Sequence, residues 1–159
     1  MKDLLIWQKG MINMSMALNE IFVDTWAWLA LSNRKDAYHE RVKGSYEEIN
    51  ATGYRMVTSD YVLDEVITAL FRSVTFDSAV QFVESLFAVI RRNQIKLEWV
   101  TEERFKTAWL LRKRYQDKPD ISFTDLTSFV LMQELRINKV FTGNGHFENV
   151  GLGFEVFPK

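Results

Sequence analysis

Three carboxylates and one amide of this 159-residue chain lie close to predicted strands, at positions that suit metal chemistry. Asp24 ends the apolar run EIFVD, Glu65 lies in the helix after RMVT, and Asn144 follows KVFT. Asp125 lies in the first turn of the helix before KVFT. Carboxylates without cationic partners repel one another, and hard oxygen ligands suit Mg²⁺ or Mn²⁺. Such ions bind phosphate oxygens and activate water, so the pattern favours phosphodiester cleavage.

Each of these carboxylates also has a purely structural interpretation. Asp24 has the position of a helix cap, and Asp125 completes a capping box with Ser122. Helical periodicity places Glu65 at one margin of a core face and Asp64 at the opposite margin. The spacing alone therefore does not decide between Asp64 and Glu65, or between capping and catalysis.

The two histidines and the absence of cysteine narrow the chemistry further. His39 falls in a charged helix, where we expect it to face solvent. His146 either approaches the carboxylates or makes a local hydrogen bond in the turn at Asn144 and Gly145, and Asn-Gly is a strong signal for a tight reverse turn. Without cysteine, thiol nucleophiles, disulfides and Cys-ligated zinc are excluded. An oxygen-ligand site is favoured over a histidine-rich one.

The charge balance argues against capture of a polyanion from a distance. The chain has 20 Lys plus Arg and 21 Asp plus Glu, a net charge of −1, so a polyanion must be held locally or through metal ions. Arg112, Lys113 and Arg114 form a run, but helical spacing points them to different sides. The apolar stretches fall short of the roughly 20 residues of a membrane helix, and we expect a cytoplasmic protein.

Strands and helices are predicted to alternate along the chain. The strands are predicted at residues 20–24, 55–58, 95–100, 139–142 and 154–157, and the helices at 25–32, 36–49, 61–71, 76–92, 101–117 and 126–135. This alternation predicts a single α/β domain of three layers, with a mostly parallel central sheet flanked by helices. Residues 1–19 are predicted to be an extension, either a loosely attached tail or a short helix, without a signal-peptide core.

Four segments occur in an order that resembles PIN-domain ribonucleases, in particular their small toxin-type members. They are IFVDTWAWLAL, TSDYVLDEVITAL, ISFTDLTSFVLMQEL and FTGNGHFENVGLGF, and they span nearly everything after residue 20. The resemblance implies a PIN domain at residues 20–159, in which acidic residues on a parallel sheet bind Mg²⁺ or Mn²⁺ and cleave RNA. It also implies that Asp24, Glu65 and Asp125 are the metal ligands, which settles the choice between Asp64 and Glu65.

Two positions depart from the family's pattern. Family members commonly have a small hydroxyl residue shortly after the first aspartate, and here only Thr25 supplies one, because Trp26 follows it. Their last motif usually reads Thr-x-Asp, whereas this chain has Asn144 at the acidic position. An asparagine still offers a carbonyl oxygen to a metal or a water, but one negative charge is lost. We therefore expect one bound ion, weaker binding of a second and reduced cleavage.

Substrate contacts and partners are less closely defined. We expect the Thr25 hydroxyl to contact substrate. Thr127 and Ser128 lie near Asp125, where they either hydrogen-bond a phosphate or a metal-bound water or simply pack their helix. The resemblance implies an RNA substrate, a small antitoxin protein that blocks the site, and a homodimer. One rival is a PIN domain that lost turnover through Asn144 and acts as an RNA-binding or protein-interaction module. A phosphatase with Asp24 as nucleophile ranks last, because position 26 is not the aspartate it requires.

Overall fold

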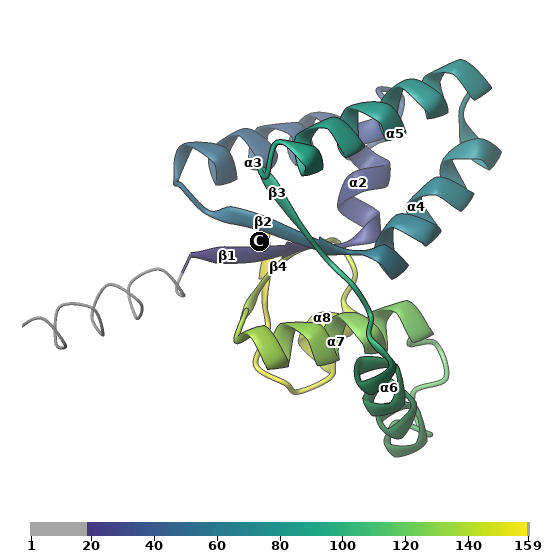
Figure 1. Ribbon diagram of the computed structural model, residues 1–159, viewed down its shortest axis with the longest axis vertical. Helices are drawn as coiled ribbons and strands as arrows, with labels where there is room; N and C mark the ends of the chain where they lie inside the picture. Colours follow the sequence, from purple (N-terminus) through teal and green to yellow (C-terminus); the bar gives the residue numbers. More distant parts are fainter. Residues whose placement is uncertain (1–18, 159) are drawn as a thin grey trace, which may run out of the picture.

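The central sheet consists of parallel strands. The computed structural model describes residues 19–158, in which the strands follow the order β3-β2-β1-β4-β5 (Figure 1). They are β1 (Glu20–Val23), β2 (Arg55–Ser59), β3 (Ile95–Glu98), β4 (Lys139–Phe141) and β5 (Glu155–Phe157). β1 is central, because its Phe22 pairs with Val57 of β2 and with Val140 of β4. The extension predicted at residues 1–19 lies, apart from Asn19, outside the described residues.

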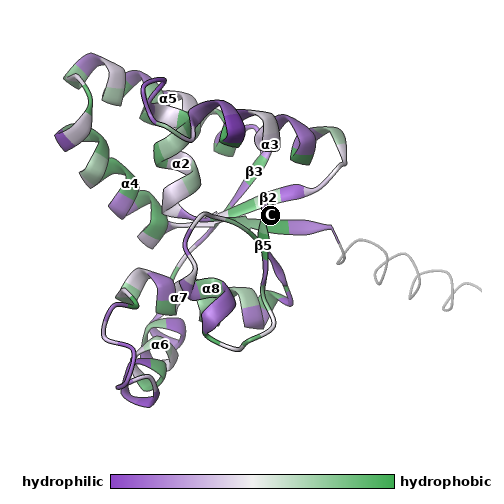
Figure 2. Cartoon of the chain, turned by 180° about the vertical axis from the view of Figure 1, so that it is seen from behind, coloured by the Kyte–Doolittle hydropathy of each residue, from purple (hydrophilic) through white to green (hydrophobic). Residues whose placement is uncertain are grey.

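Helices cover both faces of this sheet. One layer holds α2 (Thr25–Ser32), α3 (His39–Ala51), α4 (Asp60–Ser73) and α5 (Phe76–Arg91), and the other holds α6 (Glu102–Arg114), α7 (Phe123–Leu135) and α8 (His146–Asn149). Figure 2 shows the two layers from behind. The predicted three-layer α/β fold is confirmed, and all strand pairs are parallel. Within residues 19–158, no helix has both the length and the apolar character needed to cross a membrane.

The strands are apolar on both sides because helices cover both sides. Ile21, Phe22 and Val23 are at most 2% exposed. Hydroxyl side chains then start four of the helices: Ser59, Thr75, Thr101 and Ser122 each accept a hydrogen bond from a backbone N–H in the first turn of α4, α5, α6 and α7, respectively. These caps fix where each helix begins relative to the sheet.

α7 carries a site residue into the interior. Residues 124–132 of this helix are all buried, and Phe129 packs edge-on against Phe147 with ring centroids 4.9 Å apart. A helix enclosed in this way is apolar all round apart from side chains with a specific polar partner. Asp125, which is 6% exposed, is such a side chain, so its position is fixed by the packing of the helix that bears it.

The structure differs from the sequence-based expectation at two local features. His39 is buried rather than solvent-facing, because it starts α3 directly against α2 and its Nδ1 lies 2.9 Å from the Ala30 carbonyl. The Asn144-Gly145 pair leads into α8 rather than closing a simple reverse turn. The Asn144 side chain accepts a hydrogen bond from the N–H of His146 at 3.0 Å, which favours the first helical turn.

Candidate active site

The carboxyl ends of β1 and β4 form the edge where a sheet of this kind binds ligands. β1 leads into α2 on one face and β4 leads into α8 on the other, so the connections diverge between these neighbouring strands. Asp24 follows β1, is 3% exposed, and donates its backbone N–H to the Phe141 carbonyl at 3.1 Å. Thr142 follows β4, and its hydroxyl donates to Asp24 Oδ2 at 2.8 Å. Asp24 is therefore held at this divergence by both strands.

Among residues 19–158, no cation contacts Asp24 to balance its negative charge. Burial raises the pKa of Asp24, the hydrogen bond from Thr142 lowers it, and the charges of Asp125 and Glu65 raise it, with a result of about 7. Asp24 occupies the N-cap position of α2, yet its side chain makes no capping hydrogen bond. Helix capping therefore does not account for a carboxylate at this position.

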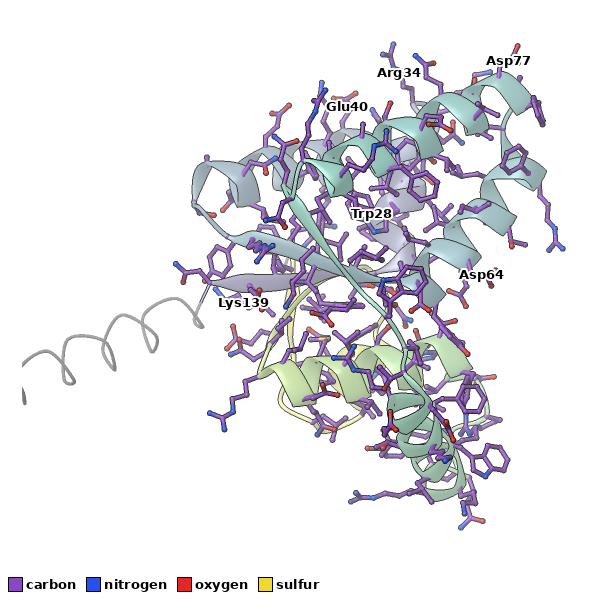
Figure 3. The ribbon with its side chains drawn as sticks, in the orientation of Figure 1. Trp28, Arg34, Glu40, Asp64, Asp77 and Lys139 are labelled. Atoms are coloured by element: carbon purple, nitrogen blue, oxygen red, sulfur yellow. The ribbon has the colours of Figure 1, made fainter. Side chains whose placement is uncertain are left out.

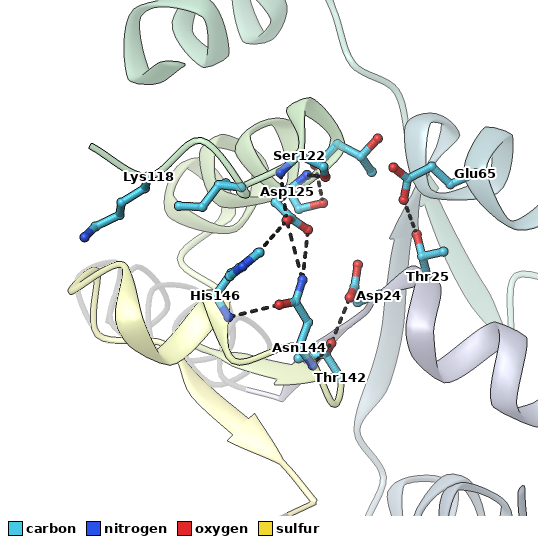
Figure 4. A network of polar contacts seen from close by, with 12 residues as sticks. Asp24, Thr25, Glu65, Lys118, Ser122, Asp125, Thr142, Asn144 and His146 are labelled. Atoms are coloured by element: carbon cyan, nitrogen blue, oxygen red, sulfur yellow. Dashed lines mark hydrogen bonds and ion pairs between the residues drawn. The ribbon is translucent and has the colours of Figure 1, made fainter. Parts of the chain in front are cut away.

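Asp125 caps its helix and faces the site at the same time. Its backbone N–H donates to Ser122 Oγ at 3.0 Å, and its Oδ2 accepts from the Ser122 N–H at 3.2 Å, which is the predicted capping box. On the other side, His146 Nδ1 lies 3.2 Å from Oδ2, and Asn144 Nδ2 lies 3.3 and 3.4 Å from the two carboxylate oxygens (Figure 4). The structural and the chemical interpretations of Asp125 are thus compatible.

The amide of Asn144 has one chemically consistent orientation. A carboxylate only accepts hydrogen bonds and a backbone N–H only donates, so the Asn144 Nδ2 must face Asp125 and its Oδ1 must face the N–H of His146. The backbone N–H of Asn144 also donates to the Thr142 hydroxyl at 3.0 Å. Asn144 therefore presents a hydrogen-bond donor to the carboxylates, whereas its carbonyl, the atom expected to reach a metal, is directed at the backbone of α8.

Glu65 reaches toward the site from the neighbouring helix. The hydroxyl of Thr25, at the start of α2, donates to Glu65 Oε2 at 2.8 Å, which joins α2 to α4 (Figure 4). Asp64 is exposed, and Figure 3 shows it on the outer side of α4. The geometry thus supports Glu65 rather than Asp64 as the partner of Asp24. The Thr25 hydroxyl, which was expected to contact substrate, instead donates its hydrogen bond to Glu65.

Two other predicted contact residues are enclosed in α7. Thr127 and Ser128 are fully buried, and both hydroxyls donate to the carbonyl of Thr124, at 2.8 and 2.9 Å. This arrangement supports the packing alternative, in which neither hydroxyl contacts substrate. Arg112, from the basic run, is likewise structural, because its guanidinium donates to carbonyls of the loop after α6, including that of Ile121 at 2.7 Å.

Two residues of the site have larger roles than the sequence suggested. Sequence reasoning missed Thr142, although it directly follows an apolar run, as Asp24 does, and the same inspection of strand ends identifies it. For His146, both alternatives hold in part: its ring approaches Asp125 and its backbone N–H makes the local bond to Asn144. The β4–α8 loop therefore contacts both Asp24 and Asp125.

The donor set at this sheet edge fits a hard divalent cation. All three acidic side chains offer oxygen, and Asp24 is raised in pKa partly by its acidic neighbours, a repulsion that a cation would remove. In the part of the chain that the structure describes, no group of three or more His, Cys, Asp or Glu side chains is already arranged to hold a metal ion. Ligation by all three carboxylates therefore requires side-chain movement, and of the three only Glu65 lines the adjacent pocket of about 320 Å³.

The fold and the site define a member of the PIN domain family. This family matches residues 21–152, and the chain belongs to it. The PIN resemblance seen in the sequence motifs is therefore confirmed by the family match.

Particular relatives can be named within the family. The chain is similar to the 23S rRNA-specific endonuclease VapC20 of Mycobacterium tuberculosis, strains CDC 1551 / Oshkosh and H37Rv, with 32% identity over 139 residues, which cover 87% of this chain and 99% of the relative. The crystal structure of VapC20, described as a Sarcin-Ricin loop cleaving toxin, matches with a TM-score of 0.68 and 33% identity over 82% of this chain and 95% of that one. Sequence and structure therefore agree on the same relative.

Proposed function

We propose that this protein is a toxin-type PIN endoribonuclease that hydrolyses RNA phosphodiester bonds with the aid of Mg²⁺ or Mn²⁺. The observation that carries the proposal is Asp24, a buried carboxylate of a PIN domain whose pKa is raised to about 7 by burial and by acidic neighbours. Asp24, Glu65 and Asp125 would hold the ion. When bound, such an ion polarises phosphate oxygens and lowers the pKa of water.

The protein's own groups position these carboxylates. Thr142 orients Asp24, Thr25 orients Glu65, and the Ser122 N–H with the Asn144 amide orients Asp125. Partners that orient ligands in this way raise the affinity and geometric precision of a metal site. Asn144 supplies a donor where an acidic residue would supply charge, so we propose weaker binding of a second ion and slower cleavage than an acidic residue would give.

The relative's described target gives the first substrate to test. RNA containing the Sarcin-Ricin loop of 23S rRNA, and the same loop with a scrambled sequence, are incubated with the protein in Mn²⁺ and in EDTA. We expect cleavage in Mn²⁺ only, and its loss in both Asp24→Asn and Asp125→Asn. Cleavage that persists in EDTA or in either variant would overturn the metal site, because contaminating nuclease or another centre would then be responsible.

A second function is favoured by one specific contact. Asn144 carries no charge where the family's usual pattern has an acidic residue, and its amide donates to Asp125, which is the change expected of a PIN domain that binds RNA without cutting it. Activity separates the two functions. Tight RNA binding without cleavage at high Mn²⁺ concentration, in a protein whose Asn144→Asp variant does cleave, would establish the binding module.

We further propose a homodimer formed through α6. Four large apolar side chains lie exposed at the end of β3 and on α6: Trp99, Phe105, Trp109 and Leu110. Phe105 and Trp109 lie one turn apart on α6, and a second copy would cover them, since exposed apolar patches mark interfaces. Light scattering should show that Trp109→Glu shifts the protein toward monomer, whereas Phe76→Glu, at an exposed apolar residue of α5, leaves the mass unchanged. An unchanged mass for Trp109→Glu would exclude this face.

The remaining partner proposals rest on the toxin resemblance. We propose a small antitoxin protein that binds this chain and blocks the carboxylates, and a cytoplasmic location, where the RNA substrate is found. Copurification of a small protein that inhibits cleavage would test the first. A cleavage assay that is insensitive to every copurifying protein would count against it.

A further inference from the structure

An uncharged or acidic surface would not hold RNA beside this site. Asp24, Glu65 and Asp125 repel phosphates in the absence of an ion, and the whole chain has a net charge of −1. Affinity for a nucleic acid comes mainly from cations that contact its phosphates. Those cations must therefore be concentrated at one place on the protein, close enough to the carboxylates for one strand to reach both.

A groove of the required kind lies in the helical layer that contains α2, α4 and α5. It has a volume of about 1000 Å³ and runs between the α2–α3 loop and the start of α5. Of its twelve lining residues, three are cations (Arg34, Lys35 and Arg72), seven carry hydroxyl or amide groups, and none is acidic. Such a lining matches the charge and the oxygen-rich surface of a phosphate and sugar backbone.

The groove is continuous with the active site through one residue. Arg72 lines both this groove and the pocket that also contains Thr25 and Glu65. Glu65, Thr68 and Arg72 succeed one another at helical spacing along one face of α4. At a rise of 1.5 Å per residue, Arg72 lies roughly 10 Å along the helix axis from Glu65. Figure 3 shows Asp64 near the sheet end of α4 and Arg34 in the outer part of this layer, away from the sheet.

The three cations of the groove make no ion pair within the described residues. Among residues 19–158, no carboxylate lies within 4.0 Å of the side-chain nitrogens of Arg34, Lys35 or Arg72, all of which are exposed. Exposed cations outside the groove also lack an ion pair within this range, as Arg91, Arg92 and Lys113 do, but they do not line this groove. What distinguishes the groove is that it gathers three unpaired cations in one lining without an acidic residue.

We infer that this groove binds the phosphate backbone of the RNA substrate on one side of the scissile bond. The inference rests on the proposed function, because it assigns the substrate's path to a site that cleaves RNA. An acidic polypeptide is the competing occupant, but protein interfaces depend on buried aromatic and aliphatic anchors, and Val74 and Phe82 are the only apolar residues of this lining. The groove is thus a phosphate track that leads to Glu65.

The test uses the full chain silenced by Asp125→Asn, so that RNA is bound and not cut. The groove variant of this silenced chain carries Arg34→Gln, Lys35→Gln and Arg72→Gln together. The control variant carries Arg91→Gln, Arg92→Gln and Lys113→Gln together. The control removes the same charge at exposed residues near the ends of α5 and α6. Fluorescence anisotropy measures binding of a labelled single-stranded RNA over a range of KCl concentrations.

We expect the groove variant to bind the RNA at least about tenfold more weakly and to lower the slope of log affinity against log salt by about 2, at roughly 0.7 per phosphate contact. The control variant should remain within about twofold of the silenced parent. Equal losses in both variants, or no loss in the groove variant, would overturn the inference. Thermal unfolding of both variants should match the parent, since all six residues are on the surface.

Two further measurements separate the inference from its rivals. If the unaltered chain cuts RNA, and the silenced groove variant binds RNA as tightly as the silenced parent, only the phosphate track fails. If the unaltered chain does not cut RNA and the silenced parent does not bind it, the proposed function fails as well. Poly-L-glutamate serves as the acidic polypeptide probe. If the silenced parent binds poly-L-glutamate, and the groove variant no longer binds it but still binds RNA, the groove would be reassigned to a protein partner. In the otherwise unaltered chain, Arg72→Gln should raise KM severalfold and leave kcat within about twofold, because the contact is remote from the reacting phosphate.

Discussion

Carboxylates gather at two places in the described part of this fold, and only one of the two clusters contains an arginine or a lysine. In the first, Arg104 of α6 donates to Glu134 of α7 at 2.8 and 2.9 Å and to Glu98 of β3 at 3.0 Å. In the second, Asp24 and Asp125 are contacted by hydroxyl, amide, imidazole and backbone groups. The clusters differ in charge balance and not in hydrogen bonding, since every carboxylate of both has a partner.

The pKa values record this difference. The hydrogen bond with Arg104 lowers the pKa of Glu134, and for Glu98 the effect of burial is outweighed by Lys96 and Arg104, so that its pKa is lowered too. The pKa of Asp24 is raised to about 7. A balanced cluster stabilises the fold, whereas an unbalanced one costs stability and is retained where a charged ligand balances it. The comparison therefore supports a structural role for the first cluster and the proposed metal chemistry for the second.

The largest effect should come from removing charge within the unbalanced cluster. Glu65→Gln should lower the rate of Mn²⁺-dependent RNA cleavage by more than about 100-fold, because even outer partners of metal ligands typically contribute 10–100-fold. Asp64→Asn is the matched control, since this neighbour is exposed and, although it lines the same pocket as Glu65, its side chain makes no hydrogen bond or ion pair with the described residues. A Glu65→Gln variant as active as Asp64→Asn would remove Glu65 from the site.

The balanced cluster should respond in stability instead. Arg104→Met leaves Glu134 without its ion-pair partner and Glu98 with Lys96 alone, so we expect unfolding by urea to show a loss of about 3 kcal/mol, at the lower end for broken buried ion pairs. Lys106→Met breaks an ion pair exposed on both sides, with Glu102, and should cost less than about 0.5 kcal/mol. Similar losses for the two variants would mean that Arg104 contributes nothing beyond a surface pair.

The pH dependence of stability should differ between the parent and Asp24→Asn. The pKa of Asp24 is about 7 in the fold and 3.8 as the unperturbed value, so between these pH values the folded state keeps a proton that the unfolded state has released. Stability in EDTA should therefore fall as pH rises from about 4 to 7, by on the order of 2–4 kcal/mol relative to Asp24→Asn. Parallel curves for the two proteins would show that Asp24 is not raised in pKa.

Most of the fold was predictable because its signals are local. The apolar runs EIFV, RMVT and KVF became central strands, and the spacing of Ser122 and Asp125 predicted the capping box that the structure shows. His39 was placed wrongly because its own helix is charged, whereas its burial depends on a contact with Ala30 of another helix. Helical periodicity predicts which face of a helix is buried, but it does not predict which neighbouring element packs against the end of that helix.

The site was predictable in its residues and not in its orientation. Inspection of strand ends located Asp24 and Asn144, and the family resemblance chose Glu65. The direction of the Asn144 amide is fixed by its contacts with Asp125 and with the N–H of His146. These contacts depend on the tertiary structure, so the spacing of residues in the sequence could not predict the direction. Residue type decides which atoms are offered, and tertiary contacts decide which of them faces the site.

The smallest expected effect, at Asn144, tests the comparison most closely, because Asn144→Asp makes the unbalanced cluster still more negative. The new carboxylate would lie about 3.3 Å from Asp125 in place of an amide donor. In EDTA we expect a loss of about 1 kcal/mol, because a hydrogen bond is replaced by repulsion between two like charges. In Mn²⁺ the order should reverse: the variant should be stabilised more by the ion and cleave RNA severalfold faster. Thermal unfolding with and without Mn²⁺ measures both effects on stability, and a variant that behaves as the parent in both conditions would mean that Asn144 does not face Asp125 in solution.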